Sequence, residues 1–498
     1  MQPESQVIGL KKQKLQKIID LGINPFPNRS KRTHKINILR ENQDEFVKQK
    51  QKVTICGRLD AMRRQGRIGF GNVSDDSGRI QIFVKKDVVG EENYEIFKLL
   101  DLGDFVQIEG ECFVTQKGEY SVKAHKITIL SKNLRPIPTV KEKIVDGKIK
   151  RWDEFSDIEL RYRKRYLDLL LNPEIKKTFE IRAKIINEVR NYLDNKGFLE
   201  VDTPVLQTLY GGANARPFIT HHNTLDTSFY LRIATELYLK RLIVAGIEKV
   251  YEMGKDFRNE GMDRTHNPEF TMMELYQAFA DYFDMMDLTE DLIYEISKKI
   301  SGSENIIYQE QEISFKKPWK RASMIDLILE ETGFDASDFD YEKIKKFCKK
   351  NEIEIEPNAG AGKLIEELFE VFVEPKLFQP TFVIDYPKEV SPLAKTKPGN
   401  PNLVERFELF IAGNEFANAF TELNDPIDQR KRLEAQAKLR ELGDLEANVV
   451  DEDFLEALEY GMPPTGGLGV GIDRLVMLFT NNTSIKEVIL FPQMRPEI

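Results

Sequence analysis

The sequence predicts an α+β fold in two modules, a small N-terminal β-barrel and a larger domain built on an antiparallel sheet. The chain has 498 residues, which is longer than one ordinary domain. Residues 51–132 alternate apolar and polar side chains with the period of strands. Residues 176–498 mix helical stretches with hairpin-like strands, which favours an antiparallel sheet over parallel βαβ units.

Composition and charge indicate a globular chain with two tasks. A hydrophobic content of 41% supports a sizeable core and excludes a disordered or collagen-like protein. The net charge of −9 argues against a nucleic-acid partner, but its distribution reverses that reading. Residues 1–150 carry 29 Lys and Arg against 19 Asp and Glu, and the rest carry 44 against 63. A basic front module joined to an acidic body suggests two functions, with chance unevenness of the solvated surface as the alternative.

Several classes of protein are excluded by what the sequence lacks. No uncharged apolar run approaches the roughly 18–20 residues that span a bilayer, and the N-terminal Met-Gln-Pro-Glu has no apolar signal-peptide core. Cys56, Cys112 and Cys348 are too few and too scattered for a disulfide framework or a zinc site. These features predict a cytoplasmic protein in a reducing setting, with no membrane partner.

Residues 1–50 predict an N-terminal helical extension. Apolar side chains recur at helical spacing over residues 8–21 with lysines between them, and Gly22 ends this helix. Such a helix is either a basic arm on nucleic acid or an ordinary amphipathic helix packed on the body.

Residues 51–135 predict a five-stranded barrel. A helical stretch at 91–103 lies between the third and fourth strands, which is the order of an OB-fold, a small barrel that often binds single-stranded nucleic acid. Alternation places Ile80, Ile82 and Val84 together on one face of the third strand, where they fit the barrel core. The predicted strands are 53–59, 67–73, 79–84, 104–114 and 120–130.

Residues 136–175 predict a linker that becomes a basic helix, and residues 176–498 form the second domain. That domain opens with an amphipathic helix at 176–196 and a strand at 198–206. Residues 281–385 suggest mainly helices and connections, without recognisable chemistry.

A first group of candidate functional side chains lies in a predicted hairpin with a long tip. Arg258 and Glu260 share one face of its first strand by parity. A planar guanidinium suits a phosphate and an aromatic ring suits a base, although a structural ion pair across the hairpin is the alternative. One face of the second strand carries Phe270, Met272, Glu274 and Tyr276.

A second group is a glycine-rich strand that leads into a helix. Gly467, Gly469 and Gly471 have period two, so one face of the strand is bare backbone against which a flat ligand can lie. Arg474, in the following helix, is placed to reach a polyphosphate. Close packing of another element is the alternative for the glycines but does not explain the arginine.

A third group pairs two acids across a predicted two-residue hairpin turn at Gly413-Asn414. In that register Glu408 and Glu415 share one face. Facing carboxylates repel unless a cation lies between them, and hard oxygen ligands beside nucleotide phosphates suggest Mg²⁺. Exposed acids on a hairpin edge are the alternative.

The same hairpin also predicts a local irregularity. Asn418, Phe420 and Glu422 have the opposite parity to the two acids. All five side chains can line one cavity only if the second strand has a β-bulge near Ala417.

Weaker signals lie elsewhere in the second domain. Residues 210–218 form a glycine-hinged loop, and residues 234–237 follow it. Of the five histidines, only His266 lies inside a group of candidate functional residues. His221 and His222 are more typical of a surface pair than of a metal site.

In order and spacing, these stretches resemble the motifs of class II aminoacyl-tRNA synthetases. FRNEG…HNPEFTMMELY is similar to motif 2, GGLGVGIDRL to motif 3, and FLEVDTPVL, with Pro204, to the dimer-forming motif 1. With GGANARPF, ATELYLKR, EVSPLAK and ERFELFIAGNEFANAFTEL, the pattern is identified as that of the class II lysyl-tRNA synthetase family, from the barrel to the C-terminus. The resemblance implies an antiparallel-sheet catalytic domain behind an OB-fold that reads the anticodon.

The resemblance also implies ligands and their residues. It implies L-lysine, ATP and tRNA(Lys) as substrates, Mg²⁺ as cofactor, and a homodimer. ATP is assigned to Arg258, Glu260, His266, Phe270 and Arg474, and Arg258 and Arg474 are the catalytic residues. Lysine is assigned to Gly212, Glu236, Glu274, Tyr276, Asn418 and Glu422, the metal to Glu408 and Glu415, and the anticodon to Phe70, Gln81 and Glu119. Many bacterial members carry an arginine just before the histidine, where this chain has Thr265, with Arg264 one residue away.

Charge arguments agree with this assignment. An acid-rich pocket complements the net positive charge of lysine. Attack of the lysine carboxylate on ATP joins two anions, so Arg258, Arg474 and Mg²⁺ offset the repulsion. An aspartate- or asparagine-specific ligase of the same subclass is the nearest rival, but Glu422 would repel or ignore those substrates. A non-catalytic tRNA-binding relative is a second rival, which the intact arginines and metal acids oppose.

Overall fold

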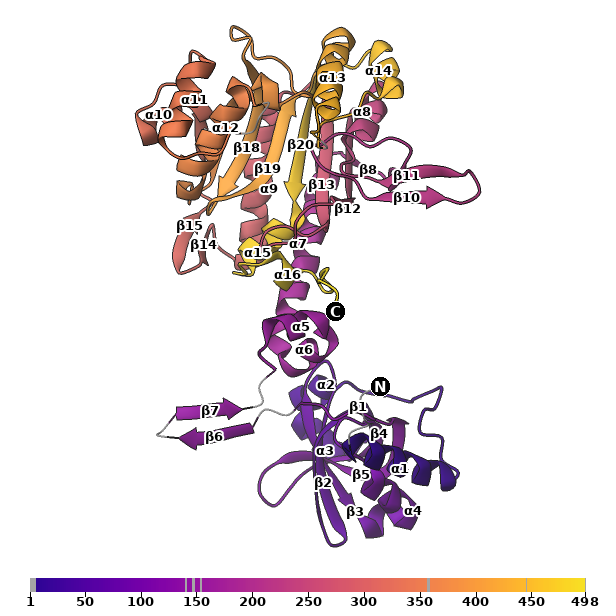
Figure 1. The fold of residues 1–498 in the computed structure, drawn as a ribbon. Helices are drawn as coiled ribbons and strands as arrows, with labels where there is room; N and C mark the ends of the chain where they lie inside the picture. Colours follow the sequence, from indigo (N-terminus) through magenta and orange to yellow (C-terminus); the bar gives the residue numbers. More distant parts are fainter. Residues whose placement is uncertain are drawn as a thin grey trace. The chain divides into compact units, whose positions relative to one another are not determined.

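A computed structural model describes residues 6–138, 141–145, 148–152, 155–355, 359–444 and 446–497. The chain divides into two compact units, Met1–Phe155 and Ser156–Ile498 (Figure 1). None of the helices among the described residues is long and apolar enough to cross a membrane.

The first unit is built on a closed five-stranded barrel. Its strands follow each other around the barrel in the order β1-β2-β3-β5-β4, with β1 also paired to β4. Ile80, Ile82 and Val84 point into the core, as predicted. The topology and the helix between the third and fourth strands confirm the OB-fold. The elements are β1 (Lys52–Gln65), β2 (Ile68–Ser74), β3 (Arg79–Lys85), α4 (Lys86–Leu99), β4 (Phe105–Val114) and β5 (Tyr120–Ser131).

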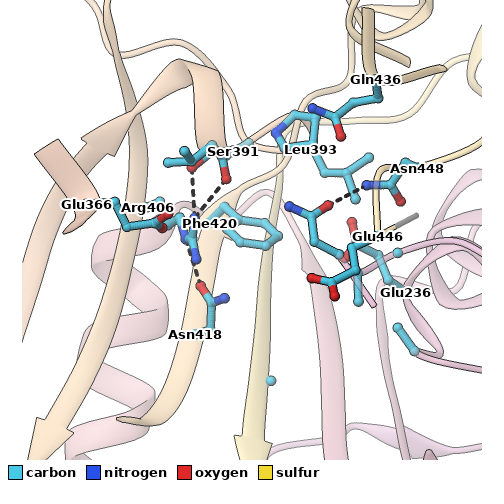
Figure 2. A pocket seen from close by; sticks show the side chains of 18 of the residues that line it. Glu236, Glu366, Ser391, Leu393, Arg406, Asn418, Phe420, Gln436, Glu446 and Asn448 are labelled. Carbon is cyan, nitrogen blue, oxygen red and sulfur yellow. Dashed lines mark hydrogen bonds between the residues drawn. The ribbon is translucent and has the colours of Figure 1, made fainter. Parts of the chain in front are cut away.

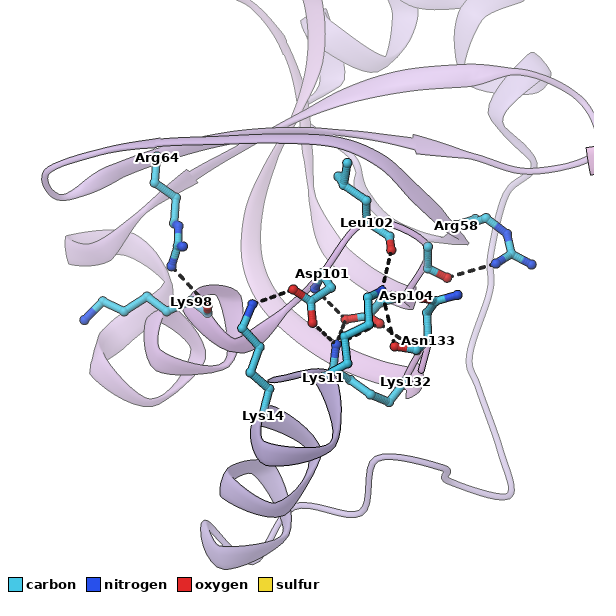
Figure 3. Close-up of polar contacts among 11 residues, drawn as sticks. Lys11, Lys14, Arg58, Arg64, Lys98, Asp101, Leu102, Asp104, Lys132 and Asn133 are labelled. Atoms are coloured by element: carbon cyan, nitrogen blue, oxygen red, sulfur yellow. Dashed lines mark hydrogen bonds and ion pairs between the residues drawn. The ribbon is translucent and has the colours of Figure 1, made fainter. Parts of the chain in front are cut away.

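Three N-terminal helices precede the barrel, α1 (Gln6–Asp20), α2 (Ile36–Glu41) and α3 (Gln43–Gln49). Ile18 of α1 is fully buried in the same core as the barrel residues. Lys11 and Lys14 of α1 bond to Asn133 and Asp101 of the barrel unit (Figure 3). The structure therefore favours the packed amphipathic helix over the free basic arm.

The predicted linker contains more structure than expected. It includes a hairpin of β6 (Lys141–Val145) and β7 (Lys148–Trp152). The expected basic helix is divided into α5 (Ile158–Arg163) and α6 (Arg165–Leu171), followed by η1 (Pro173–Ile175). The break turns Arg165 inward, where it is fully buried and pairs with Asp168 at 2.6 Å. Linker residues 139, 140, 146, 147, 153 and 154 lie outside the described part of the chain.

The second unit is built on an eight-stranded sheet in the order β16-β17-β18-β19-β20-β13-β12-β8. All neighbours are antiparallel except the two edge pairs, β16 with β17 and β12 with β8. The predicted antiparallel α+β domain is thus confirmed. The strands are β8 (Leu199–Glu200), β12 (Lys249–Phe257), β13 (Glu269–Ala278), β16 (Lys320–Ser323), β17 (Thr381–Pro387), β18 (Leu403–Ile411), β19 (Asn414–Thr421) and β20 (Thr465–Gly471).

The strand expected at 198–206 is much shorter than predicted. Only Leu199 and Glu200 join the sheet, where they pair in parallel with β12. The chain then turns away because Thr203 donates both its backbone N–H and its hydroxyl to the buried carboxylate of Glu252, at 3.0 and 2.7 Å.

One face of the sheet is covered by helices that form the main core. In Figure 1, α9 (Tyr282–Ser301) crosses behind β18, β19 and β20, which it contacts. Beside it pack α7 (Lys176–Asn195), α15 (Ile472–Phe479) and α16 (Ile485–Val488). Because side chains alternate along each strand, the other face is free for the residues singled out above.

The remaining elements surround that face. Helix α8 (Glu236–Val244) packs on β12 and β13 and on α14 (Glu452–Glu459), which packs on α13 (Pro426–Glu441). A separate core joins α10 (Met324–Thr332), α11 (Tyr341–Lys350) and α12 (Ala361–Phe372) to β17 and β18. Shorter elements are β9 (Leu206–Gln207), β10 (Ile219–His222), β11 (Thr227–Leu231), β14 (Asn305–Tyr308), β15 (Gln311–Ser314), η2 (Glu374–Lys376) and η3 (Lys388–Val390).

Candidate active site

Two adjoining cavities lie on the open face of the large sheet. The larger has a volume of about 870 Å³ and the smaller about 250 Å³. The smaller is lined by all five predicted ATP residues, and the larger by every predicted lysine residue except Glu422. The two cavities share Arg258, Met272, Glu415, Asn418 and Gly469. The predicted phosphate-binding end and the predicted ammonium-binding end therefore meet in one continuous site.

The β12–β13 hairpin supplies the arginine between the cavities. Strand β12 ends at Phe257, and the backbone N–H of Arg258 donates to the carbonyl of Pro268 at 2.9 Å. This bond holds Arg258 at the mouth of the tip, where its guanidinium lies 5.1 Å from the centre of the Phe270 ring. A cation above an aromatic face is attracted by the ring, so the two side chains hold each other in place.

The tip of the hairpin carries the more exposed members of the predicted ATP set. Glu260 is exposed, whereas His266 bonds through Nδ1 to Asp263 at 2.8 Å. Asp263 also accepts the backbone N–H groups of Thr265 and His266, both at 2.7 Å. The tip thus has an internal hydrogen-bonded turn that places His266 on the wall of the smaller cavity.

The glycine-rich strand β20 forms the floor of the site. Gly467 lines the larger cavity, Gly471 the smaller, and Gly469 both, while Leu468 and Val470 are buried in the core behind them. A Cβ atom at position 467 would overlap the Glu422 carboxylate and the Tyr276 ring. The predicted bare backbone shelf is present, and at this position only glycine fits.

The predicted β-bulge is present in β19. Leu409 pairs with Ala417, but the next residue, Phe410, pairs with Glu415, so Phe416 is the extra residue. The bulge reverses the parity of the strand at this point. As a result Glu408, Glu415, Asn418 and Phe420 all line the larger cavity.

The turn of that hairpin lies one residue earlier than predicted. Ile411 pairs with Asn414, so the two turn residues are Ala412 and Gly413 rather than Gly413 and Asn414. Their φ angles of 50° and 67° are the left-handed pair that a tight hairpin turn of this length requires. The Asn414 side chain donates to the carbonyl of Ala412 at 2.8 Å, which stabilises the turn from the strand side.

Glu408 and Glu415 are the two acids predicted to hold a metal. Glu408 accepts hydrogen bonds from Arg406 at 2.5 Å and from the hydroxyl of Tyr386 at 2.9 Å. Burial, and then the charge of Glu415, raise the pKa of Glu408 to about 8. Glu415 pairs with Arg474 at 3.2 Å. A carboxylate whose charged form is disfavoured by its neighbour is suited to a cation, so the donor set fits Mg²⁺.

The protein would supply only part of the coordination of such a metal. Within the described residues, no three His, Cys, Asp or Glu side chains lie close enough together to hold a metal by themselves. Mg²⁺ is usually held by one or two carboxylates together with substrate phosphates and water. The site therefore fits a metal that binds together with a nucleotide.

The far end of the larger cavity is acidic. Glu274 is buried and accepts the Thr235 hydroxyl at 2.8 Å, so a neutral donor faces it rather than a cation. Burial, then the charges of Asp256 and Glu236, raise the pKa of Glu274 to about 8. Gly212, with a φ of 89°, brings its loop against Glu236, and a Cβ atom there would meet the Glu236 Cβ at 3.0 Å.

Glu422 does not lie on the cavity wall. Its side chain is fully buried and fills the space that a side chain at Gly467 would occupy, on the sheet face that carries the cavity, and its Oε2 pairs with the Lys240 ammonium at 2.5 Å. Burial raises the pKa of Glu422 to about 8, against the opposing effect of Lys240. The carboxylate thus lies on the same sheet face as the Tyr276 ring, which lines the cavity.

Arg406 is a candidate site residue that the sequence analysis missed. It is partly buried in the wall of the larger cavity, where it donates to the side chains of Asn418 at 3.1 Å and Ser391 at 2.9 Å (Figure 2). Arg406 also bonds to Glu408. It therefore holds one predicted metal-binding residue, Glu408, and one predicted lysine-binding residue, Asn418, which lie on the paired strands β18 and β19. The signal was available, because Arg406 lies two residues before Glu408 and so on the same strand face.

Helix α12 also contributes to the wall, which corrects the expectation that residues 281–385 carry no recognisable chemistry. Lys363, Glu366 and Glu370 of this helix line the larger cavity. Glu366 and Glu370 are four residues apart and therefore lie on one helix face. That spacing is the signal that could have identified them.

The barrel unit carries the predicted anticodon residues on its surface side. Phe70 lies 5.1 Å from the Phe83 ring centre and 4.9 Å from the Arg63 guanidinium carbon. Gln81 accepts the Ser121 hydroxyl at 3.0 Å, and Glu119 is exposed in the turn before β5. Aromatic faces with a neighbouring arginine are the usual components of a platform for single-stranded nucleic acid.

Family models match most of both units. The model described as tRNA synthetases class II (D, K and N) matches residues 157–495. The model described as OB-fold nucleic acid binding domain matches residues 53–130.

Curated relatives match nearly the whole chain. The Lysine--tRNA ligase of Bacillus subtilis is 51% identical over 98% of this chain and 97% of its own length. The same enzyme of Moorella thermoacetica is 49% identical over 100% and 99%, and that of Lactococcus lactis subsp. cremoris is 52% identical over 98% of each. With two continuous cavities, an OB-fold barrel and this similarity, the chain belongs to the class II aminoacyl-tRNA synthetases and, within them, to the lysine–tRNA ligase family.

Proposed function

We propose that the two cavities form the site where this chain activates L-lysine with ATP to lysyl-adenylate and then transfers lysine to the 3′ end of tRNA(Lys). The observation that carries the proposal is the junction at Arg258, where a cavity with guanidinium groups opens into a cavity with carboxylates. The side chain of aspartate or asparagine carries no cation that would match Glu274 and Glu422. The side chain of lysine carries one.

ATP would occupy the smaller cavity. Arg258 would hold the α-phosphate, and Glu260 would accept the adenine amino group. Phe270 and Arg474 would lie on the two faces of the adenine ring, with His266 near the terminal phosphates. The support is that all five residues line one space of about 250 Å³.

Mg²⁺ would bind between Glu408 and Glu415, next to the phosphates. Bound there, the metal would neutralise phosphate charge and orient the nucleotide. The protein itself contributes the two carboxylates, which Arg406, Tyr386 and Arg474 hold in place.

Lysine would occupy the larger cavity. Its α-amino group would lie at Gly212 and Glu236, and its carboxylate at Arg258. Its ε-ammonium would be held by Tyr276 and Glu422, with Glu274 and Asn418 completing the pocket. This order places the lysine carboxylate beside the nucleotide, ready for in-line attack on the α-phosphate. No protein base is required because the carboxylate is already ionised, and Arg258 and Arg474 stabilise the charge that develops at phosphorus.

The first unit would recognise the tRNA anticodon. Stacking of a base on Phe70 would contribute roughly 1–3 kcal/mol, and Gln81 and Glu119 would contact neighbouring base edges. The excess of basic residues over acidic ones in residues 1–150 would attract the tRNA backbone. We keep the assignment of residues 51–135 to anticodon binding and of 176–498 to catalysis. A homodimer through the motif 1 region and a cytoplasmic location complete the proposal.

Lysine-dependent ATP–pyrophosphate exchange tests the proposal. The wild-type chain should exchange with lysine and Mg²⁺, and not with aspartate or asparagine. Exchange driven by aspartate, or no exchange with any amino acid, would contradict it.

A Glu422→Ala variant tests the side-chain pocket. Truncating one partner of a buried charge pair typically costs 2 kcal/mol or more, so the lysine KM should rise roughly thirtyfold or more. The ATP KM should change far less. Glu456→Ala, at an exposed position of α14, is the matched control and should leave both constants unchanged. Equal increases in both KM values would remove Glu422 from the lysine pocket.

A further inference from the structure

A lysine of the chain itself reaches into the acidic end of the active site. Lys240 lies on α8, one helical turn after Glu236, and its side chain is fully buried. Its ammonium lies 2.5 Å from Glu236 Oε1 and 2.5 Å from Glu422 Oε2. The same ammonium is 5.9 Å from the centre of the Tyr276 ring. A resident alkylammonium is thus held by the groups assigned above to the lysine substrate.

Lys240 does not belong to the cavity wall. Glu236 and Tyr276 line the larger cavity, whereas Glu422 and Lys240 are fully buried and do not line it. Any effect of Lys240 on a ligand in the cavity must therefore pass through the two carboxylates. The surrounding elements add further charges. Arg232 is shared between Asp256, at 3.2 Å, and Glu252 of the same strand, Arg406 of β18 bonds to Glu408, and Glu274 of β13 accepts hydrogen bonds from Thr235.

The charges of the site match a lysine substrate only if Lys240 is counted. Three buried carboxylates, Glu236, Glu274 and Glu422, surround the acidic end. A lysine substrate brings two ammonium groups, and its carboxylate faces Arg258 in the proposed function. Together with Lys240, the two substrate ammonium groups give one cation for each carboxylate. Without Lys240, one carboxylate would stay buried and unpaired, which is costly.

We propose that Lys240 is a positioning residue for lysine recognition, which favours the ionised forms of Glu236 and Glu422 and orients both carboxylates before the substrate arrives. This inference rests on the lysine pocket of the proposed function. Two carboxylates in a space sealed from water repel each other and tend to bind a proton. A neutral or shared-proton pair would attract an ammonium group only weakly. Lys240 opposes that tendency in the empty enzyme and holds the two carboxylates in place, so the substrate finds a preorganised site.

Lys240→Met tests the inference because methionine keeps an unbranched side chain one atom shorter than lysine and removes the charged ammonium group. Breaking a buried pair from one side is costly, so the lysine KM in pyrophosphate exchange should rise roughly ten- to hundredfold. The ATP KM should stay nearly unchanged, and raising the pH should recover part of the lost lysine affinity by ionising the carboxylates. An unchanged or lower lysine KM in a folded variant would overturn the proposal.

The chain contains a matched control for this substitution. Lys132 of the barrel unit is also fully buried and pairs with two carboxylates, Asp101 at 2.6 Å and Asp104 at 2.9 Å. Lys132→Met removes the same charge from the same kind of environment, but in the unit that does not contain the lysine pocket. It should lower the thermal stability of its own unit and leave the lysine KM unchanged. A comparable rise of the lysine KM in both variants would mean that both act through stability alone.

Chemical rescue gives a second readout that does not depend on methionine being tolerated. Lys240→Ala leaves a space for a short alkylammonium between Glu236 and Glu422. Added propylammonium should lower the lysine KM of this variant towards the wild-type value, while neutral propanol should not. Rescue by both, or by neither, would refute the positioning role. If the wild-type chain shows no lysine-dependent exchange, it is the proposed function that fails instead.

Discussion

Each unit of the molecule buries a lysine between two carboxylates, and the two clusters differ in how completely their carboxylates are bonded. In the barrel unit, Asp104 accepts two bonds from Lys132 and one backbone N–H each from Asn133 and Asp101 (Figure 3). Asp101 is paired in addition with Lys14. In the catalytic unit, Glu422 is paired with Lys240 alone and has no further hydrogen bond from the described residues.

The pKa shifts of the two clusters have opposite signs. Burial would raise the pKa of Asp101, but bonds from Lys132 and Lys14 outweigh burial and lower it. Burial dominates at Glu422 and raises its pKa to about 8 despite Lys240. A lowered carboxyl pKa adds stability that is lost as the pH falls through it, whereas a raised one removes stability as the pH rises. The comparison teaches that an ion cluster whose carboxylates are fully hydrogen-bonded stabilises the fold. A cluster whose carboxylates lack such bonds retains affinity for a ligand.

The largest expected effect comes from a substitution that disrupts the hydrogen-bonded cluster of Lys132, Asp101 and Asp104. Asp104→Asn removes a charge and replaces one acceptor oxygen by a donor that would face Lys132 and a backbone N–H. Removing one partner of a buried pair costs about 3–5 kcal/mol of stability, so the barrel unit should unfold at a much lower denaturant concentration. Chemical denaturation followed by circular dichroism measures this loss.

The matched change in the other cluster is Glu422→Gln. It should cost the fold little, because the carboxylate it replaces is itself destabilised by burial, and it should weaken lysine binding instead. If Asp104→Asn left stability intact, or if Glu422→Gln unfolded its unit while lysine binding persisted, the distinction between the two clusters would be wrong.

An intermediate effect is expected from pH. Glu274 has a pKa of about 8, raised first by burial, so it is mostly protonated below that pH. A neutral carboxyl does not attract an ammonium group, and binding must therefore expel a proton. The lysine KM should rise as the pH falls from about 9 to about 7, by up to tenfold per pH unit for each proton expelled. Initial exchange rates at saturating ATP and Mg²⁺ measure it.

Glu274→Gln is the control for the pH experiment. Glutamine keeps an oxygen that can accept the Thr235 hydroxyl but cannot titrate. Its lysine KM should be higher than that of the wild type and should vary less with pH. A wild-type lysine KM that does not rise as the pH decreases would show that Glu274 is ionised throughout, contrary to the effect of burial.

Local rules predicted much of the fold and of the site. Alternation of side chains was enough for the barrel, for the bare face of β20 and for Glu274 with Tyr276 on one side of β13. The bulge in β19 was predictable for the same reason, because only a change of parity could bring Asn418 to the side of Glu415. These features depend on neighbours in one strand or one hairpin.

Features that depend on distant partners were not predictable in this way. Lys240 belongs to an ordinary amphipathic helix, and only the fold brings Glu422, far along the chain, against its ammonium. Strand β8 is short because Thr203, just after it, donates hydrogen bonds to Glu252, which lies on strand β12. The place of Glu422 depends on the missing side chain of Gly467, because the Glu422 carboxylate fills the space that a side chain there would take. Each is a property of three-dimensional contact rather than of spacing.

The smallest expected effect concerns the barrel unit as a reader of tRNA. Gln81→Ala removes a side-chain amide whose oxygen accepts the Ser121 hydroxyl, and any base contact made through that amide is lost with it. One hydrogen bond contributes about 1 kcal/mol, so kcat/KM for aminoacylation of the cognate tRNA should fall roughly fivefold. Gln49→Ala, at an exposed position of α3, is the matched control and should charge tRNA normally.

Pyrophosphate exchange without tRNA decides whether the two units have separate tasks. Gln81 lies in the unit Met1–Phe155, whereas the cavities lie wholly in Ser156–Ile498. If the barrel only reads tRNA, its substitution leaves exchange at the wild-type rate and affects the charging step alone. A parallel loss of exchange would mean that lysine activation depends on the barrel. The two units would then act cooperatively, and the contrast drawn above between a stabilising cluster and a ligand-binding cluster would not separate their tasks.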